Sequence, residues 1–375
     1  MPGASVGSRV EKTDPGDLQV LKYFGGSFLF TALCLAAGAW LGWTSTGSIM
    51  GMLGILWIIA VLGVLETSLS FDNAVVNATV LKDMDPVWQR RFLTWGILIA
   101  VFGMRIIFPL AIVAIAAGLD PWSALTLAID RPEEYERILG DAHIGIAGFG
   151  GAFLAMVGLS FFLGEDKETH WIGFVERPFA SLGSVGSAPL ALSLLALLGV
   201  AQLLPGEETI TFLTAGICGL VAFVAVDSVG DLIGGGDEEG AKIARAGVGG
   251  FLYLELLDAS FSFDGVIGAF ALSNNLFIIP LGRGIGAMFV RSLTIMLVEK
   301  GTLAEYRFLE HGAFYAIIAL AAIMLLSARF HIPETVTGLI GAGFIGAAFL
   351  SSIWSKDGAE PPILAGAVAP SGEAL

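Results

Sequence analysis

Two related blocks of acidic, hydroxyl and amide residues lie inside long apolar stretches of this chain. They are residues 66–73 (Glu-Thr-Ser-Leu-Ser-Phe-Asp-Asn) and residues 258–265 (Asp-Ala-Ser-Phe-Ser-Phe-Asp-Gly). In each block an acidic residue is followed six positions later by an aspartate, and Ser-Phe-Asp is shared letter for letter. Carboxylate, hydroxyl and amide oxygens suit hard divalent cations such as Mn²⁺, Mg²⁺ or Ca²⁺, and neither block contains His or Cys. The duplicated blocks therefore predict an oxygen-lined site for a divalent cation.

The candidate metal ligands carry oxygen atoms in one block or the other: Glu66, Ser70, Asp72, Asn73, Asp258, Ser262 and Asp264. Each block is followed by a glycine and an arginine nine positions apart, Gly96 with Arg105 and Gly282 with Arg291. An ionisable side chain inside a membrane span costs roughly 2.5 to 3.5 kcal/mol, so it needs pairing, water or a bound ion. Arg105 and Arg291 are therefore expected to be internal counter-charges for the carboxylates. In a simpler alternative, each arginine only neutralises carboxylates to hold helices together.

Each block places several polar side chains on one helix face, at about 100° per residue. The first face carries Glu66, Ser70, Asn73 and Asn77, and the second carries Glu255, Asp258 and Ser262. Asp72 and Asp264 lie off these faces if the helices are regular. Either these aspartates point to a neighbouring helix or the backbone breaks at the motif, and both arrangements stay open.

The composition is that of a membrane protein. Of the 375 residues, 55% are hydrophobic and only 14% are charged, with a mean hydropathy of +0.82. Soluble proteins carry about 25% charged residues. The net charge of −15 argues against a nucleic-acid partner, because phosphate binding needs clustered Lys and Arg. Cys34 and Cys218 have no Cys-x-x-Cys or His neighbour and are expected to be buried packing residues.

Apolar segments of about 20 residues, the length that crosses a bilayer, recur along the chain. We expect about ten of them, near residues 23–43, 49–81, 92–118, 142–164, 188–204, 209–233, 248–272, 280–298, 311–328 and 336–354. The segment at 188–204 is short, and the one at 49–81 is too long for one straight crossing, which suggests a break or an extension near the first block. Residues 1–20 and 356–375 are expected to be disordered tails around a membrane domain at 21–355. The acidic segment at 120–141 is expected to be a solvated loop.

The positive residues predict how the chain crosses the membrane, because short cytoplasmic loops carry the excess of Lys and Arg. With the N-terminus inside, the outer loops hold only Arg131, Arg137 and Arg329. This distribution favours a protein of the cytoplasmic membrane with both ends inside. The two blocks then lie on the second and seventh spans, and this odd offset predicts an inverted repeat. Inverted repeats commonly place a substrate site near the bilayer midplane.

The first block resembles the Glu-x-x-Leu-Ser-x-Asp-Asn signature of the TerC family, and the second resembles its Asp-x-x-Phe-Ser-x-Asp copy in the DUF475 branch. The resemblance covers roughly residues 50–330. It implies a multi-pass membrane protein linked to tellurium resistance by name and to manganese export by activity. Glu66, Asp72 and Asn73 match the first motif, and Asp258 and Asp264 match the second. Gly265 stands where many members of the family carry Ser or Asn.

The leading hypothesis is a secondary transporter that exports a divalent cation, with Mn²⁺ as the first candidate, through a midplane site shared by two inverted halves. Asp72 and Asp264 are its expected principal ligands, and no cofactor besides the transported cation is expected. An alternative is a membrane scaffold of a metal or tellurite stress-response complex, which docks partner proteins through acidic cytoplasmic segments such as residues 237–239. The expected partners are the lipid bilayer, the cation and either a second copy of the chain or stress-response proteins. A third option is oxyanion handling by the two arginines.

Enzymatic activity is not expected, because the sequence contains neither His-Glu-x-x-His nor Gly-x-Ser-x-Gly. Residues 341–346 fit the dinucleotide-binding pattern Gly-x-Gly-x-x-Gly, but they lie in the last apolar segment with no preceding strand. These glycines, and Gly282 with Gly286, are expected to allow close helix packing.

Overall fold

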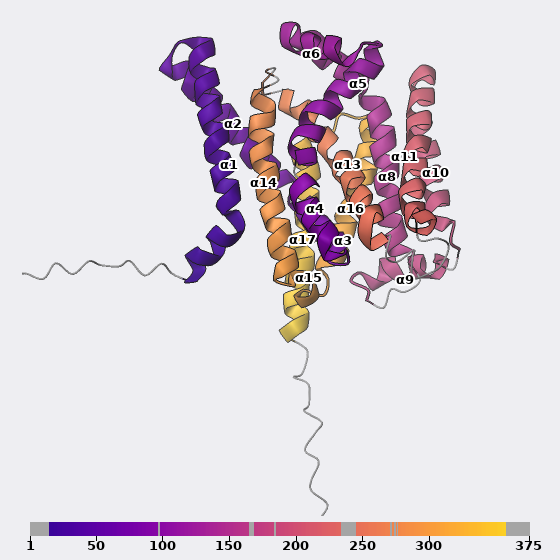
Figure 1. The fold of residues 1–375 in the computed structure, drawn as a ribbon. Coiled ribbons are helices and arrows are strands. Elements are labelled where there is room, and N and C mark those ends of the chain that lie inside the picture. Colours follow the sequence, from indigo (N-terminus) through magenta and orange to yellow (C-terminus); the bar gives the residue numbers. More distant parts are fainter. Residues whose placement is uncertain are drawn as a thin grey trace, which may run out of the picture.

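The computed structural model describes residues 15–96, 98–164, 169–183, 185–233, 245–270, 272–273, 275 and 277–357 (Figure 1). Every regular element within these residues is a helix. The expected all-α class is therefore confirmed, and the fold fits a polytopic helical bundle. For residues 262–270 only the backbone is described, so the side chains of Ser262 and Asp264 lie outside the described part.

The first two helices are joined by a tight turn. α1 (Pro15–Thr46) is followed by Gly47, whose positive φ of 60° suits glycine, and then by α2 (Ile49–Leu69). The Ser48 side chain caps α2 by accepting a hydrogen bond from the Gly51 N–H at 3.0 Å. The expectation of a disordered tail through residue 20 is wrong for residues 15–20, because α1 extends beyond its apolar stretch. Residues 1–14 lie outside the described part.

The third crossing contains two π-helical stretches. After α3 (Phe71–Leu81), the chain continues through α4 (Pro86–Arg91), η1 (Phe92–Gly96), η2 (Ile99–Ile107) and α5 (Phe108–Ala117). π-helical turns are rare in proteins, and those that occur often lie at functional sites. Arg105, one of the expected counter-charges, lies on η2.

The acidic segment that follows is helical. α6 (Pro121–Asp130) and α7 (Pro132–Asp141) pack against α5 at one end of the bundle (Figure 1). The expectation of a solvated loop was wrong, because apolar side chains on one face of α7 are buried while its acidic residues face outward. Tyr135 and Leu139 are each only 1% exposed and belong to a hydrophobic core.

The middle of the chain forms a group of helices around α8 (His143–Phe162). Its members are α9 (Gly173–Leu182), α10 (Ala188–Ala201) and α11 (Gly206–Ile233). α8 packs closely against α11, because a Cβ built at Gly219 would lie 2.3 Å from the Phe149 carbonyl oxygen and one at Gly148 would lie 2.5 Å from the Phe212 carbonyl oxygen. Glycine at these positions lets the two backbones approach, as in other membrane helix pairs.

The last third of the chain supplies the helices that enclose the first block. They are α13 (Gly250–Phe270), α14 (Ile278–Glu299), α16 (Leu309–Ser327) and α17 (Glu334–Asp357). The same part of the chain also contains η3 (Arg245–Gly249) and α15 (Thr302–Glu305). α14 packs against α1, α2 and α3, and α17 packs against α2, α3 and α16. The second tail was expected from residue 356, but α17 continues to Asp357. The remaining residues lie outside the described part.

Eight helices in the described part are long and apolar enough to cross a membrane. Together with α10, which has 14 residues, and α13, which has 21 residues but carries three acids, they correspond to the expected segments. α2 and α3 run toward the end of the bundle that holds α4 and α15, whereas α13 runs away from that end (Figure 1). These opposite directions agree with the inverted orientation of the two blocks.

The outward surface is apolar and suits a lipid bilayer. Exposed large side chains include Trp40, Trp57, Trp95 and Ile115, which are 62 to 82% exposed. The expectation for the two cysteines was right for Cys34, which is buried, and wrong for Cys218, which is exposed. Cys218 lies on α11, a candidate membrane span, where an apolar side chain can face lipid instead of a core.

Candidate functional site

The first block contains a break in its helix. α2 ends at Leu69, Ser70 has non-helical φ and ψ of −99° and 19°, and α3 begins at Phe71. The excess length of the second apolar segment is therefore divided between two helices, as expected. Of the two arrangements left open for Asp72, both apply: the backbone is interrupted, and Asp72 also faces a neighbouring helix, α17.

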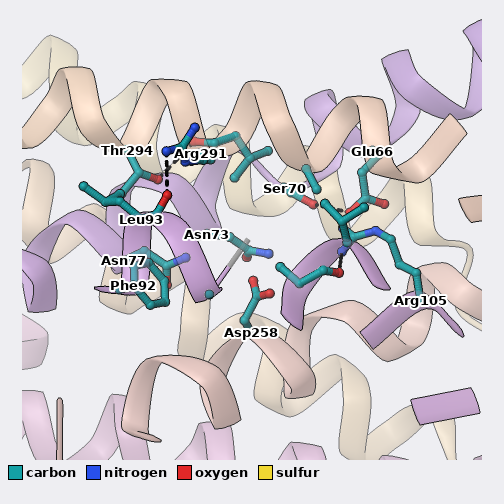
Figure 2. A pocket seen from close by; sticks show the side chains of 15 residues that line it. Glu66, Ser70, Asn73, Asn77, Phe92, Leu93, Arg105, Asp258, Arg291 and Thr294 are labelled. Carbon is teal, nitrogen blue, oxygen red and sulfur yellow. Dashed lines mark hydrogen bonds and ion pairs between the residues drawn. The ribbon is translucent and has the colours of Figure 1, made fainter. Parts of the chain in front are cut away.

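The expected polar face lines a cavity of about 50 Å³ in the interior of the bundle (Figure 2). A water molecule needs a space of about 10 to 15 Å³, so the cavity suits a few waters or a small ion with part of its hydration shell. Its polar lining residues come from α2, α3, η2, α13 and α14: Glu66, Ser70, Asn73, Asn77, Arg105, Asp258, Arg291 and Thr294. We call this space the first cavity.

Glu66 is the centre of a buried cluster of charges. Its Oε1 forms an ion pair with Arg105, and its Oε2 forms one with Arg283 at 2.7 Å. The Ser70 hydroxyl also donates to Oε1 at 3.4 Å. The three charged residues are 3 to 7% exposed, so these pairs are shielded from water and their loss would be costly.

Arg283 is a residue that the reasoning from sequence missed. The glycine–arginine spacing of nine singled out Arg291, yet Arg283 lies on the same helix and reaches Glu66. The signal was present, because an arginine inside an apolar span needs a partner. Arg291 instead donates a hydrogen bond to the Leu93 carbonyl oxygen, and no carboxylate is paired with it among the described residues (Figure 2).

Glycines on α14 allow it to approach α2 closely enough for these ion pairs. A Cβ built at Gly282 would lie 2.5 Å from the Leu62 Cβ, and one at Gly286 would lie 2.4 Å from the Glu66 Cβ. Real side chains essentially never make contacts this short. The expectation that Gly282 and Gly286 serve close helix packing is therefore confirmed.

Asp72 lies outside the first cavity and lines a second one. The second cavity has about 60 Å³ and is lined by Asp72, Arg283, Phe261, Leu320 and Thr337, among others. Asp72 is 8% exposed, and its Oδ1 accepts a hydrogen bond from the Asn73 N–H at 3.0 Å. Its Oδ2 faces α17, where a Cβ built at Gly341 would lie 2.8 Å from it. The structure thus separates Asp72 from Asp258.

Two acids of α13 lie beside the first cavity. Asp258 points from α13 toward Asn73 (Figure 2). Glu255, one turn earlier, is 9% exposed, and its Oε1 has no hydrogen-bond partner among the described residues. That oxygen lies against η1, because a Cβ at Gly96 would be 2.8 Å from it. Glu255 was placed on the polar face from sequence but was not named as a candidate ligand.

The remaining expected ligands are Ser262 and Asp264, whose side chains lie outside the described part. Across the residues that are described, no group of three or more His, Cys, Asp or Glu side chains could hold a metal ion. In the first cavity the oxygen atoms come from Glu66, Asp258 and their uncharged neighbours. Of these, Glu66 is already neutralised by two arginines.

The chain matches the family described as "Protein of unknown function (DUF475)" over residues 71–357. The matched part includes Asp72, Asn73 and the whole second block, and it begins after Ser70. Comparisons with curated proteins and with solved structures found no match. Because the family match spans about three quarters of the 375 residues, the chain belongs to the DUF475 family.

Proposed function

We propose that this protein is a membrane transporter that exports a divalent metal cation, with Mn²⁺ as the first candidate. The observation that carries the proposal is the first cavity, which brings ionisable, amide and hydroxyl side chains together among apolar membrane helices. Polar and ionisable groups at such a depth are costly, and they typically mark an ion or substrate path. The resemblance of both blocks to the TerC motifs points to the same class of cargo.

The oxygen ligand atoms around the two cavities favour a cation as cargo, whereas the charged lining is balanced at three carboxylates and three arginines among the described residues. Glu66 is already matched by Arg105 and Arg283, so a cation in the first cavity would be attracted chiefly by Asp258. Carboxylate, amide and hydroxyl oxygens together suit Mn²⁺, Mg²⁺ or Ca²⁺. An oxyanion would meet Asp258 as well as Arg291 in the first cavity, and Asp72 would repel it in the second.

The proposed ligands are the oxygen-bearing residues of both blocks. Glu66, Ser70, Asn73 and Asp258 line the first cavity, and Asp72 lines the second. Ser262 and Asp264 remain proposed ligands on the strength of the second motif alone. We place the protein in the cytoplasmic membrane with both ends inside. The start of α1 and the end of α17 lie at the same end of the bundle (Figure 1), which supports this topology.

The test is the metal content of cells challenged with excess Mn²⁺. Cells without the protein are compared at matched expression with cells that carry the native chain, Asp258→Asn, Asp72→Asn or the control Asp130→Asn. Asp130 is exposed at the end of α6, outside the candidate spans. We expect the native chain and the control to lower cell Mn, and both cavity variants to fail.

The result that rejects transport is unchanged Mn, Mg and Ca content in cells that carry the native chain. The scaffold hypothesis would then lead, and its proposed docking segment at residues 237–239 lies outside the described part. A scaffold needs the packing of the interior and not its charge, so it would also retain partner binding in Asp258→Asn.

A further inference from the structure

Glu66 stands at the boundary between the two cavities. Glu66, Ser70 and Asn73 line both of them. Among the described lining residues, Arg105 and Asp258 belong to the first cavity, whereas Arg283 and Asp72 belong to the second. Arg291 also lines the first cavity, where it donates a hydrogen bond to the Leu93 carbonyl oxygen. Each cavity therefore contains one carboxylate of its own and one arginine that is paired with Glu66, and Glu66 is the carboxylate common to both.

The two oxygens of Glu66 are held from opposite cavities. Oε1 is paired with Arg105, which lines the first cavity, and Oε2 is paired with Arg283 at 2.7 Å, which lines the second. The side chains of the three residues are 4 to 8% exposed. A charge buried to this extent needs a partner at every stage.

The packing of α14 keeps the Glu66 carboxylate in this position. The Cα of Gly286 lies so close that a Cβ there would be 2.4 and 2.5 Å from the Glu66 Cβ and Cγ. The first two side-chain carbons of Glu66 thus have no room to swing away on this side. The longer arginine side chains, each anchored on a different helix, are the groups that can withdraw.

We propose that Glu66 is a ligand shared by the two cavities, and that Arg105 and Arg283 are alternating counter-charges that admit the cation to one cavity at a time. This proposal rests on the proposed function. A cation in the first cavity replaces Arg105 at Oε1 and gains Asp258, while Arg283 stays on Oε2. A cation in the second cavity replaces Arg283 and gains Asp72, while Arg105 returns. Glu66 keeps a positive partner throughout.

The test measures equilibrium Mn²⁺ binding and Mn²⁺ flux separately, with the full-length chain purified and reconstituted in lipid vesicles. In Arg283→Gln we expect binding at least as tight as in the native chain, because one competitor for Glu66 is removed. Flux should fall about tenfold or more, since each 1.36 kcal/mol added to a barrier slows a step tenfold. Arg283→Lys keeps the positive charge but lacks the planar guanidinium group. It should bind Mn²⁺ as the native chain does, with a flux between those of the native chain and Arg283→Gln. The control is Arg137→Gln, at an exposed arginine of α7.

The outcomes separate this proposal from the proposed function. A native chain that neither binds nor moves Mn²⁺ rejects the proposed function. Native flux in folded Arg283→Gln, or binding and flux that fall in the same proportion in both Arg283 variants, overturns the shared-ligand proposal alone. If Arg283→Gln fails to fold, Arg283→Lys decides, and native flux in that variant overturns the proposal.

Discussion

Replacing Gly286 by alanine tests whether close packing of α14 on α2 sets the position of Glu66. The new Cβ would lie 2.4 Å from the Glu66 Cβ, 2.5 Å from its Cγ and 2.9 Å from the Thr67 nitrogen. None of these atoms is the free end of a flexible side chain, so the helices must move apart. Overpacking of this kind costs about 1 to 3 kcal/mol. Replacing a glycine inside a helix by alanine by itself stabilises the folded state by about 0.5 to 1 kcal/mol.

Gly343→Ala is the matched control, because Gly343 lies within α17 and a Cβ there would meet nothing within 4 Å. Both variants gain the same stabilisation from replacing a helical glycine by alanine. The difference between their unfolding free energies therefore isolates the cost of overpacking, and we expect Gly286→Ala to be less stable than Gly343→Ala by about 1 to 3 kcal/mol. The free energy of unfolding is measured by titration with a denaturing detergent in mixed micelles. Equal unfolding free energies for the two variants would refute the reasoning.

Three further substitutions probe other parts of the same arrangement. Glu66→Gln removes the charge that two buried arginines share and should cost about 3 to 5 kcal/mol of the unfolding free energy; a cost under about 1 kcal/mol, typical of a surface pair, would contradict the buried cluster. Gly341→Ala brings a methyl group to 2.8 Å from Asp72 Oδ2 and should lower Mn²⁺ flux in vesicles, so native flux would argue against a role for Asp72. Ser48→Ala removes the hydrogen bond that the Ser48 side chain accepts from the Gly51 N–H. It should lower the unfolding free energy by about 1 kcal/mol and leave Mn²⁺ flux unchanged. A loss of flux would contradict a purely structural role for Ser48.

Several features followed from the sequence because they depend on local periodicity. The face shared by Glu66, Ser70, Asn73 and Asn77 lines the first cavity. The helical period continues across the break at Ser70, because the Ser70 N–H still donates to the Glu66 carbonyl oxygen and the Ala74 N–H to the Ser70 carbonyl oxygen. The position of Asp72 off this face follows from the same geometry. Charge and hydropathy likewise predicted the helical membrane class, because a bilayer leaves few alternatives to the helix for the backbone.

Other features depended on contacts that no local pattern contains. The acidic segment at 120–141 reads as a solvated loop, yet packing of Tyr135 and Leu139 makes it helical. Arg283 was overlooked in favour of Arg291, because the regular spacing of two glycine–arginine pairs says nothing about which arginine reaches a carboxylate.

The sequence by itself determined the class of the protein, the duplicated blocks of oxygen-bearing side chains and the need to neutralise buried charge. Only the tertiary structure decided that Asp72 and Asp258 lie in different cavities, with Glu66 between them. The physical reason is that composition and period set what each helix face carries. Which faces meet depends on how closely α14 and α17 pack against α2 and α3.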